Sequence, residues 1–170
     1  MTRTPEALRD DLAAAGWESA VMLDGGGSSQ CWFRGQTIKS TRAVHDLILV
    51  YLKGSDTTGV KTYSVKKDGS AYLSNNFKVK EFACNDGSDT VLISDELVSL
   101  LQKIRDHFGV AVTINSGYRT STYNKKVGGT TNSQHVKGTA ADIVAKGVDP
   151  LTVAQEAEYR MPDSGGIGVY

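Results

Sequence analysis

The sequence has little proline, little cysteine and no excess of either charge, and each shortage narrows what the protein can be. Eighteen glycines against 3 prolines in 170 residues favour an ordered chain with many turns. Lys+Arg and Asp+Glu both number 19, so the basic face that nucleic-acid binding needs is not expected. Cys31 and Cys84 are too few for a disulfide scaffold, and we expect each to be a small buried hydrophobe without a bridge between them.

Long apolar runs are also missing. No stretch of about 18 apolar residues occurs, so no membrane-spanning segment is expected. The amino terminus, MTRTPEALRDDL, is charged and amphipathic, which is unlike a secretory signal. The length suits one ordinary domain, or one domain plus a fragment, and the sequence does not determine an oligomeric state.

The clearest helix is expected from Asp95 to Phe108. Ser94 is a good N-cap before it, and the acidic residues of its first turn suit the positive end of the helix dipole. His107 lies in the last turn, where a cation is favourable, so we interpret it as a helix-end charge and not as a metal ligand. Apolar residues at helical spacing form one stripe: Leu97, Leu100, Leu101, Ile104 and Phe108.

Short apolar runs near this helix predict strands. Val110–Ile114 and Ala140–Val144 are rich in β-branched or small apolar residues, and Gly165–Tyr170 begins another run. A last helix is expected to begin at Asp149-Pro150. Together these elements predict an α+β fold over residues 73–170, in which helices pack on a small, mainly antiparallel sheet.

The first 52 residues predict a smaller α/β fragment. Thr4 is a plausible N-cap with Pro5 at the first helical position. Strands are expected at Ala20–Leu23, Gln30–Phe33 and Leu47–Leu52.

A connecting region is expected after this fragment. Residues 53–59 are polar and contain two glycines, which is typical of a linker. Val60–Leu73 is expected to form a small hairpin around Lys67-Asp68-Gly69-Ser70, because Asp-Gly favours a tight turn. The expected division of the chain is therefore 1–52, 53–72 and 73–170.

The stretch NSQHVKGTAADI carries the strongest chemical signal. It contains Ser133, His135, Gly138 and Asp142. Zinc accepts imidazole nitrogen and carboxylate oxygen as ligands, and the small or polar residues between them allow a tight turn. Gly138 fits a bend that needs a positive φ. A lone His–Asp pair would favour a hairpin with a hydrogen-bonded histidine, whereas the full pattern Ser-x-His-x-x-Gly-x-x-x-Asp is much more specific.

Arg119 is a second candidate site residue. It lies in SGYRT, Ser116–Thr120, directly after the strand expected at Val110–Ile114. Loop residues at strand ends are where sites are commonly built. Taken alone, Arg119 is explained equally well by a surface salt bridge, and the His–Asp motif downstream favours a substrate contact.

Together the two motifs resemble the zinc D-alanyl-D-alanine carboxypeptidases, with the related D,D-dipeptidases and phage endolysin peptidases, over residues 73–170. The resemblance implies that family's hedgehog-like fold, a zinc cofactor and a peptidoglycan stem peptide as substrate. It implies that His135 and Asp142 bind zinc. It also implies that Ser133 and Arg119 contact the substrate, with Arg119 stabilising the carbonyl oxygen as it gains charge.

In that family, a third zinc ligand and the general base come from a later Val-His-x-Asp type segment. The sequence reaches Tyr170, in GGIGVY, where that segment would begin. Asp163 lies in the wrong place for the base, and His45 would reach the site only if the first segment folded over it. Because a catalytic zinc site holds three protein ligands and one water, we expect zinc binding and hydrolysis by these 170 residues to be impaired.

A second resemblance concerns AVMLDGGGSSQCWFRGQ. Three successive glycines with flanking serines could form a nest of backbone N–H groups for a phosphate, or a flexible hairpin loop. Asp24, Gly25, Gly26 and Ser28 resemble the end of the phosphodiester glycosidase domain. The likeness covers only residues 5–52, and because a remnant of about 50 residues is marginal as an independent fold, we expect no glycosidase activity from it.

Three interpretations remain. The chain is a zinc peptidase of the cell wall, a non-catalytic wall-binding or metal-binding module, or a phosphodiester glycosidase fragment. The first implies an extracellular or cell-wall location, with phage lysis or a virion as another setting. Release of D-alanine from a stem-peptide substrate would separate the first interpretation from the others.

Overall fold

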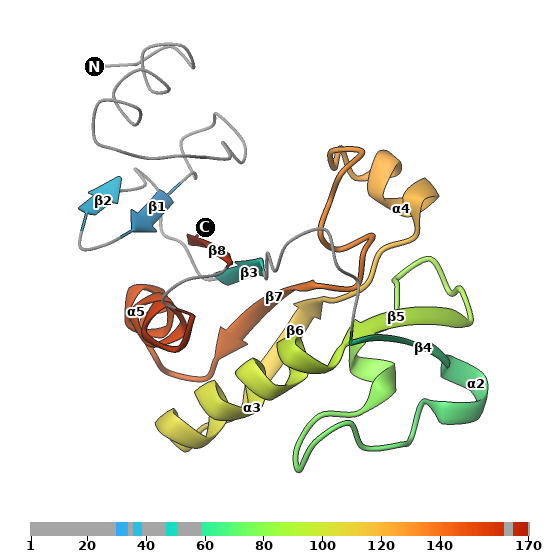
Figure 1. Cartoon of the computed structure of the whole chain (residues 1–170), viewed down its shortest axis with the longest axis horizontal. Coiled ribbons are helices and arrows are strands. Elements are labelled where there is room, and N and C mark those ends of the chain that lie inside the picture. Colours follow the sequence, from blue (N-terminus) through green and yellow to red (C-terminus); the bar gives the residue numbers. More distant parts are fainter. Residues whose placement is uncertain (1–29, 34–35, 39–46, 51–58, 162–164, 170) are drawn as a thin grey trace.

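The structure is a computed structural model that describes residues 30–33, 36–38, 47–50, 59–161 and 165–169 (Figure 1). The predicted amino-terminal helix, the strand expected at Ala20–Leu23 and the DGGGSS segment lie outside these residues. In chain order the elements are β1 (Gln30–Phe33), β2 (Gln36–Ile38), β3 (Leu47–Val50), β4 (Val60–Ser64), α2 (Val65–Asp68), the 3₁₀ helix η1 (Val79–Phe82), β5 (Thr90–Ser94), α3 (Asp95–Phe108), β6 (Val112–Ser116), α4 (Ser121–Lys126), β7 (Ala140–Ala145), α5 (Pro150–Arg160) and β8 (Gly166–Val169).

The main sheet has six strands in the order β2-β1-β8-β3-β7-β6, and β4 pairs with β5 in a separate two-stranded sheet. All of these pairings are antiparallel. The prediction of an α+β fold with a mainly antiparallel sheet is therefore confirmed. The finer prediction of a hedgehog-like fold stays a prediction.

Strand β3 lies inside the main sheet, between β8 and β7. Its register sets Ile48 opposite Asp142 on β7 and opposite Gly168 on β8. Strands from the first 52 residues and strands from the carboxyl-terminal part thus share one sheet. The proposed boundaries at residues 52 and 73 stay predictions, but the backbone of β3 directly neighbours the strand that carries Asp142.

Helix α3 has the bounds that the sequence predicts. The Ser94 hydroxyl accepts a hydrogen bond from the Leu97 amide at 3.4 Å, and Gly109 ends the helix with φ of +64°. Helix α5 also begins as predicted, because the Asp149 carboxylate caps the amides of Leu151 and Thr152. None of the described helices is both long and apolar enough to cross a membrane.

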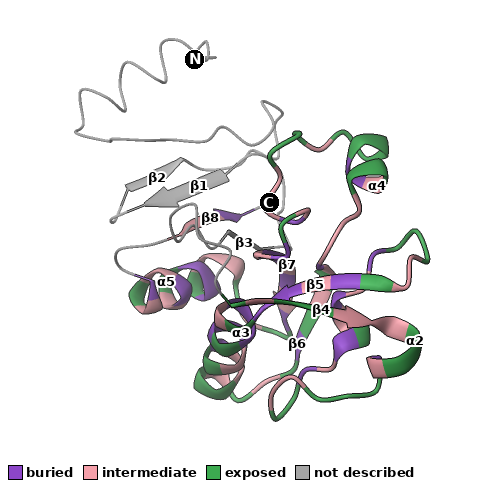
Figure 2. Cartoon of the chain, turned by 45° about the vertical axis from the view of Figure 1, so that its right-hand side comes forward, coloured by how far each residue is buried: buried purple, intermediate pink, exposed green. Residues whose placement is uncertain are grey.

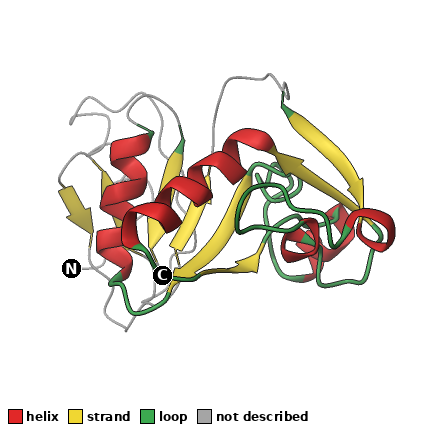
Figure 3. Ribbon diagram, turned by 90° about the horizontal axis from the view of Figure 1, so that it is seen from below, coloured by secondary structure: helices red, strands yellow, loops and turns green. Residues whose placement is uncertain are grey.

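Helices α3 and α5 contact one another, and both contact β7 (Figure 3). They therefore cover the same face of the main sheet and enclose the core. Figure 2 shows that β5 and β7 are largely buried, while α4 is mostly exposed and lies apart from the two long helices. The largest fully buried side chains are Phe77, Phe82, Ile93, Leu97, Leu101, Ile104, Ile143, Val79, Val91 and Val153.

The hairpin predicted within Val60–Leu73 is wrong. Strand β4 pairs with the distant strand β5, and α2 follows it directly. The Ser64 hydroxyl accepts from the Lys67 amide, and the Asp68 carboxylate accepts from the Ser64 amide at 2.9 Å. This reciprocal capping starts a helix where Asp-Gly would otherwise favour a turn, and Gly69 has an ordinary φ of −55°.

Candidate metal centre

Asp142 lies on β7, where the strand is held on both sides. Its backbone is opposite Ile48 of β3 and opposite Ser116 of β6, next to an irregularity between Ile114 and Ser116 in the β6–β7 pairing. Its side chain is 14% exposed. A carboxylate on a strand paired on both sides has little backbone freedom, so the sheet fixes where its oxygens lie.

His135 lies in the loop between α4 and β7, and its side chain is 7% exposed. Its Nδ1 atom is 2.7 Å from the carbonyl oxygen of Gly117. A carbonyl oxygen only accepts hydrogen bonds, so Nδ1 carries a proton, and in the neutral imidazole Nε2 is then the nitrogen left for a metal. A backbone carbonyl on the other ring nitrogen is the usual arrangement behind a metal-binding histidine.

The Nε2 atom of His135 lies 3.5 Å from Oδ1 of Asp142. Two ligands that each lie about 2 Å from a shared zinc ion can be at most about 4 Å apart, so this separation allows a common metal. Oδ1 is buried and has no hydrogen-bond partner among the described residues. A buried carboxylate oxygen without a hydrogen bond, facing the second ring nitrogen of an imidazole, fits a divalent cation, although the metal-binding roles themselves stay predictions.

Arg119 also reaches this cluster. Its Nη2 donates to Asp142 Oδ2 at 2.7 Å, and its Nε donates to the Ser116 hydroxyl at 2.9 Å. The side chain is only 19% exposed. Arg119 thus contacts both His135 and Asp142, and its contact with Asp142 is an ion pair with a candidate zinc ligand. The predicted substrate contact stays a prediction.

Ser133 belongs to the turn that leads into His135. Its amide donates to the Thr130 carbonyl at 3.1 Å, and its own carbonyl accepts from the Val136 amide. The residue is partly buried. The substrate contact that the sequence predicts for Ser133 stays a prediction.

A third protein ligand was not found among the residues that the structure describes, which hold no group of three His, Cys, Asp or Glu side chains suited to a metal. His107 lies at the end of α3, as predicted, with Nδ1 3.3 Å from the Glu156 carboxylate on α5. Cys84 is buried and free, as predicted. His45 and Asp163 lie outside the described residues.

Several residues that support this site were not predicted from the sequence. The carbonyl oxygen of Gly117, which contacts Nδ1 of His135, belongs to the SGYRT motif, so this motif is the sequence signal that could have indicated it. Asp86 and Cys84 also contact this region: the Thr120 hydroxyl donates to Asp86, and the Thr120 amide donates to Cys84 Sγ at 3.4 Å. No sequence pattern links residues that lie 34 to 36 positions apart.

Among these supporting residues, Asp86 has a lowered pKa. The hydrogen bond from Thr120, followed by that from the Ser88 amide, lowers the pKa of Asp86 from 3.8 to about 2. The pKa of Tyr118, beside Arg119, is raised, mainly by burial. Both groups keep their usual charge near neutral pH, so Asp86 accepts hydrogen bonds as an anion and Tyr118 remains a neutral phenol.

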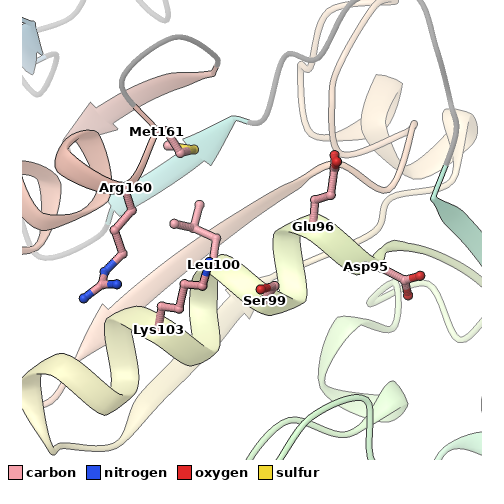
Figure 4. Close-up of a pocket in the computed structure, with 7 residues that line it drawn as sticks. All are labelled: Asp95, Glu96, Ser99, Leu100, Lys103, Arg160 and Met161. Carbon is pink, nitrogen blue, oxygen red and sulfur yellow. The ribbon is translucent and has the colours of Figure 1, made fainter.

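A pocket of about 290 Å³ lies elsewhere, between the start of α3 and the end of α5 (Figure 4). Asp95 and Glu96 line one side, and Lys103 and Arg160 line the other. None of the residues predicted from the sequence to form a site borders it. Because both acidic and basic side chains line this pocket, its lining does not favour a ligand of either charge.

One of the comparisons with known proteins found a match. A family model described as Peptidase M15 matches residues 74–170, which is more than half of the chain and includes Arg119, Ser133, His135 and Asp142. Comparison with the curated proteins and with the solved structures gave no match.

Proposed function

The chain belongs to the peptidase M15 family, and from this premise we propose that it is a zinc metallopeptidase that acts on peptidoglycan stem peptides, in the manner of the D-alanyl-D-alanine carboxypeptidases. The 3.5 Å separation of His135 Nε2 and Asp142 Oδ1, in a buried setting, is the observation that carries the proposal. The proposed setting is the cell wall or another extracellular location, with phage lysis as a further possibility.

In this proposal His135 and Asp142 hold the zinc ion. The bound metal would lower the pKa of a water molecule and polarise the scissile carbonyl. The Gly117 carbonyl keeps His135 in the tautomer that leaves Nε2 free, and the sheet holds Asp142 in place. Ser133, two residues before His135, would orient the substrate with its hydroxyl.

Arg119 has donors left for a substrate. Nε and one N–H of Nη2 are used by Ser116 and Asp142, which leaves three of the five guanidinium N–H groups. A donor aimed at the carbonyl oxygen would stabilise negative charge as it develops during attack. The same residue would then contact both a metal ligand and the substrate.

A non-catalytic zinc-binding module is the second candidate. The donor set bears on both candidates: within the described residues two protein donors are present, where a catalytic zinc site uses three and a structural one four. We therefore expect the 170-residue chain to bind zinc weakly and to release D-alanine slowly or not at all. In the Val-His-x-Asp type segment, the imidazole would bind zinc and the neighbouring carboxylate would transfer protons. Restoring only one of these side chains should therefore not restore both zinc binding and turnover.

The test compares three chains that differ after Tyr170. The 170-residue chain is measured next to chains extended after Tyr170 by a Val-His-x-Asp segment or by Val-His-x-Asn. Zinc content is determined by equilibrium dialysis, and D-alanine release from a stem peptide ending in D-Ala-D-Ala is determined separately. We expect both extensions to raise zinc content and only the Val-His-x-Asp extension to raise turnover.

Variants of the candidate ligands provide the controls. His135→Ala and Asp142→Ala should abolish zinc binding in every chain, whereas His107→Ala should leave it unchanged because that imidazole pairs with Glu156. Zinc binding that survives His135→Ala would exclude the proposed centre. Zinc binding by all chains without D-alanine release from any of them would instead support the non-catalytic module.

A further inference from the structure

Arg119 is connected to both candidate zinc ligands by different parts of the same residue. Its backbone amide donates to the His135 carbonyl oxygen at 3.1 Å. Its guanidinium group contacts Asp142 at 2.7 Å through Nη2. The loop that follows β6 therefore links the turn carrying His135 to the strand carrying Asp142 through a single residue.

The guanidinium group is itself held from a second direction. Nε donates to the Ser116 hydroxyl at 2.9 Å, while Nη2 faces the carboxylate. Two contacts on different edges of a planar fork define its orientation, which one contact to a flexible ammonium would not. The guanidinium plane is consequently fixed relative to both β6 and β7.

The two oxygens of Asp142 are distinguished by this arrangement. Oδ2 receives the Arg119 hydrogen bond, and Oδ1 is left buried, without a hydrogen bond among the described residues and 3.5 Å from His135 Nε2. Without Arg119, the carboxylate would lose the hydrogen bond to Oδ2 that defines its rotation about the Cβ–Cγ bond. A rotated carboxylate would offer the metal neither oxygen at a defined place.

We propose that Arg119 is a positioning residue that orients Asp142, so that Oδ1 alone is presented to a metal shared with His135. This inference rests on the proposed zinc site, and it assigns to Arg119 a function that precedes any contact with a substrate. Ser116 acts through Arg119 in the same arrangement. Loss of a partner behind a metal ligand typically weakens metal binding by about 10- to 100-fold.

The test uses Arg119→Ala and Arg119→Lys in the 170-residue chain. Arg160→Ala is the matched control, because Arg160 is also partly buried, 27% exposed, and also pairs with a carboxylate, that of Glu156. Zinc affinity is measured by calorimetric titration with zinc chloride, and the visible absorption of the cobalt-substituted protein reports ligand geometry. We expect Arg119→Ala to raise the Kd for zinc about 10- to 100-fold, Arg119→Lys to raise it less, and Arg160→Ala to leave it unchanged.

Crystal structures of the metal-free proteins give a readout that does not depend on metal binding. We expect Asp142 Oδ1 to leave its position facing His135 Nε2 in Arg119→Ala and to keep it in Arg160→Ala. An Asp142 carboxylate that stays in place in Arg119→Ala overturns the inference, whatever the zinc affinity. If that variant does not fold, Ser116→Ala takes its place, because it removes only the acceptor of the Arg119 Nε hydrogen bond. Asp142 Oδ1 should then shift less, in the same direction. An unchanged carboxylate position and an unchanged Kd for zinc would overturn the inference.

The same measurements separate this inference from the proposed function. If neither the wild-type chain nor the chain extended by Val-His-x-Asp binds zinc, while the metal-free structures show a displaced Asp142 in Arg119→Ala, the zinc peptidase is overturned and the orienting role of Arg119 is supported. Wild-type protein that binds zinc as tightly as Arg119→Ala, with the carboxylate unmoved, overturns only the positioning role.

Discussion

A Cβ atom on Gly138 would lie 2.5 Å from the carbonyl oxygen of Leu92. Gly138 has φ of +73°, as the sequence predicts for a bend, and its carbonyl accepts a hydrogen bond from the Ser94 amide at 2.9 Å. The turn that follows His135 is therefore packed directly on the end of β5. Glycine is required at this position for two reasons, the backbone conformation and the lack of space.

Gly138→Ala should therefore destabilise the protein and disturb the site. The left-handed backbone costs a residue with a Cβ about 1–2 kcal/mol, and relief of the overlap with Leu92 adds about 1–3 kcal/mol. Gly147→Ala is the control, because Gly147 has φ of +76° with nothing within 4 Å of its would-be Cβ. Urea unfolding should show a larger loss of free energy for Gly138→Ala, and equal losses would mean that Leu92 moves aside without cost.

Asn124 should stabilise the turn that precedes His135. It is the buried residue of α4, and its Nδ2 donates to the Thr130 carbonyl at 2.8 Å. The same carbonyl accepts from the Ser133 amide. We expect Asn124→Ala to lower the free energy of unfolding by about 1 kcal/mol, as loss of a typical hydrogen bond does, and to speed hydrogen exchange at the Ser133 amide.

The control for Asn124→Ala is Asn76→Ala. Asn76 also makes a side-chain hydrogen bond, from Gln102 Nε2 at 2.8 Å, but it is exposed and remote from the His135 turn in the hydrogen-bond network. Exchange at Ser133 should be unaffected in Asn76→Ala. Equal exchange at Ser133 in both variants and the wild type would show that Asn124 does not support this turn.

Strand β3 should be needed for the candidate metal centre. Because β3 has neighbours on both sides, the amide of Ile48 faces either β7 or β8, and proline at this position removes a ladder hydrogen bond. Ile48→Pro should lower the free energy of unfolding by at least about 1 kcal/mol and weaken zinc binding, since Ile48 is opposite Asp142. Thr37→Pro in the edge strand β2 is the control, and an equal zinc affinity in both variants would contradict the role of β3.

Asp86 should make stability depend on pH in the acid range. Its pKa is lowered in the folded protein from 3.8 to about 2, mainly by the hydrogen bond from Thr120. A lowered pKa contributes stability that is fully present above the unfolded value and is lost as pH falls through the folded value. The difference in urea midpoint between wild type and Asp86→Asn should therefore be constant near neutral pH and shrink between 3.8 and about 2.

The donor to Asp86 can be tested separately. Thr120→Ser keeps the hydroxyl and should keep the pH dependence, whereas Thr120→Val should reduce it. A pH profile that is the same in Thr120→Val and wild type would show that another group is responsible.

Local sequence patterns determined much of the fold. Helix α3 and its two ends follow from Ser94, an apolar stripe and Gly109, because capping and periodicity act within a few residues. The strands β1, β6 and β7 and the start of α5 were predicted for the same reason. The pairing of His135 with Asp142 was also predictable as a candidate, since seven positions separate two metal-ligand residue types around a glycine.

Tertiary structure alone decided the remainder. The segment at Val60–Ser64 pairs with β5, about thirty residues away, and Ser64 and Asp68 cap a helix where a turn was expected. Arg119 pairs with Asp142, and β3 lies beside β7, the strand that carries Asp142. Local sequence spacing predicts neither contact. Such contacts depend on how the strands are ordered in the sheet, which chain neighbours do not specify. The sequence thus determined which residue types were available for a metal centre, and the order of the strands decided which of them meet.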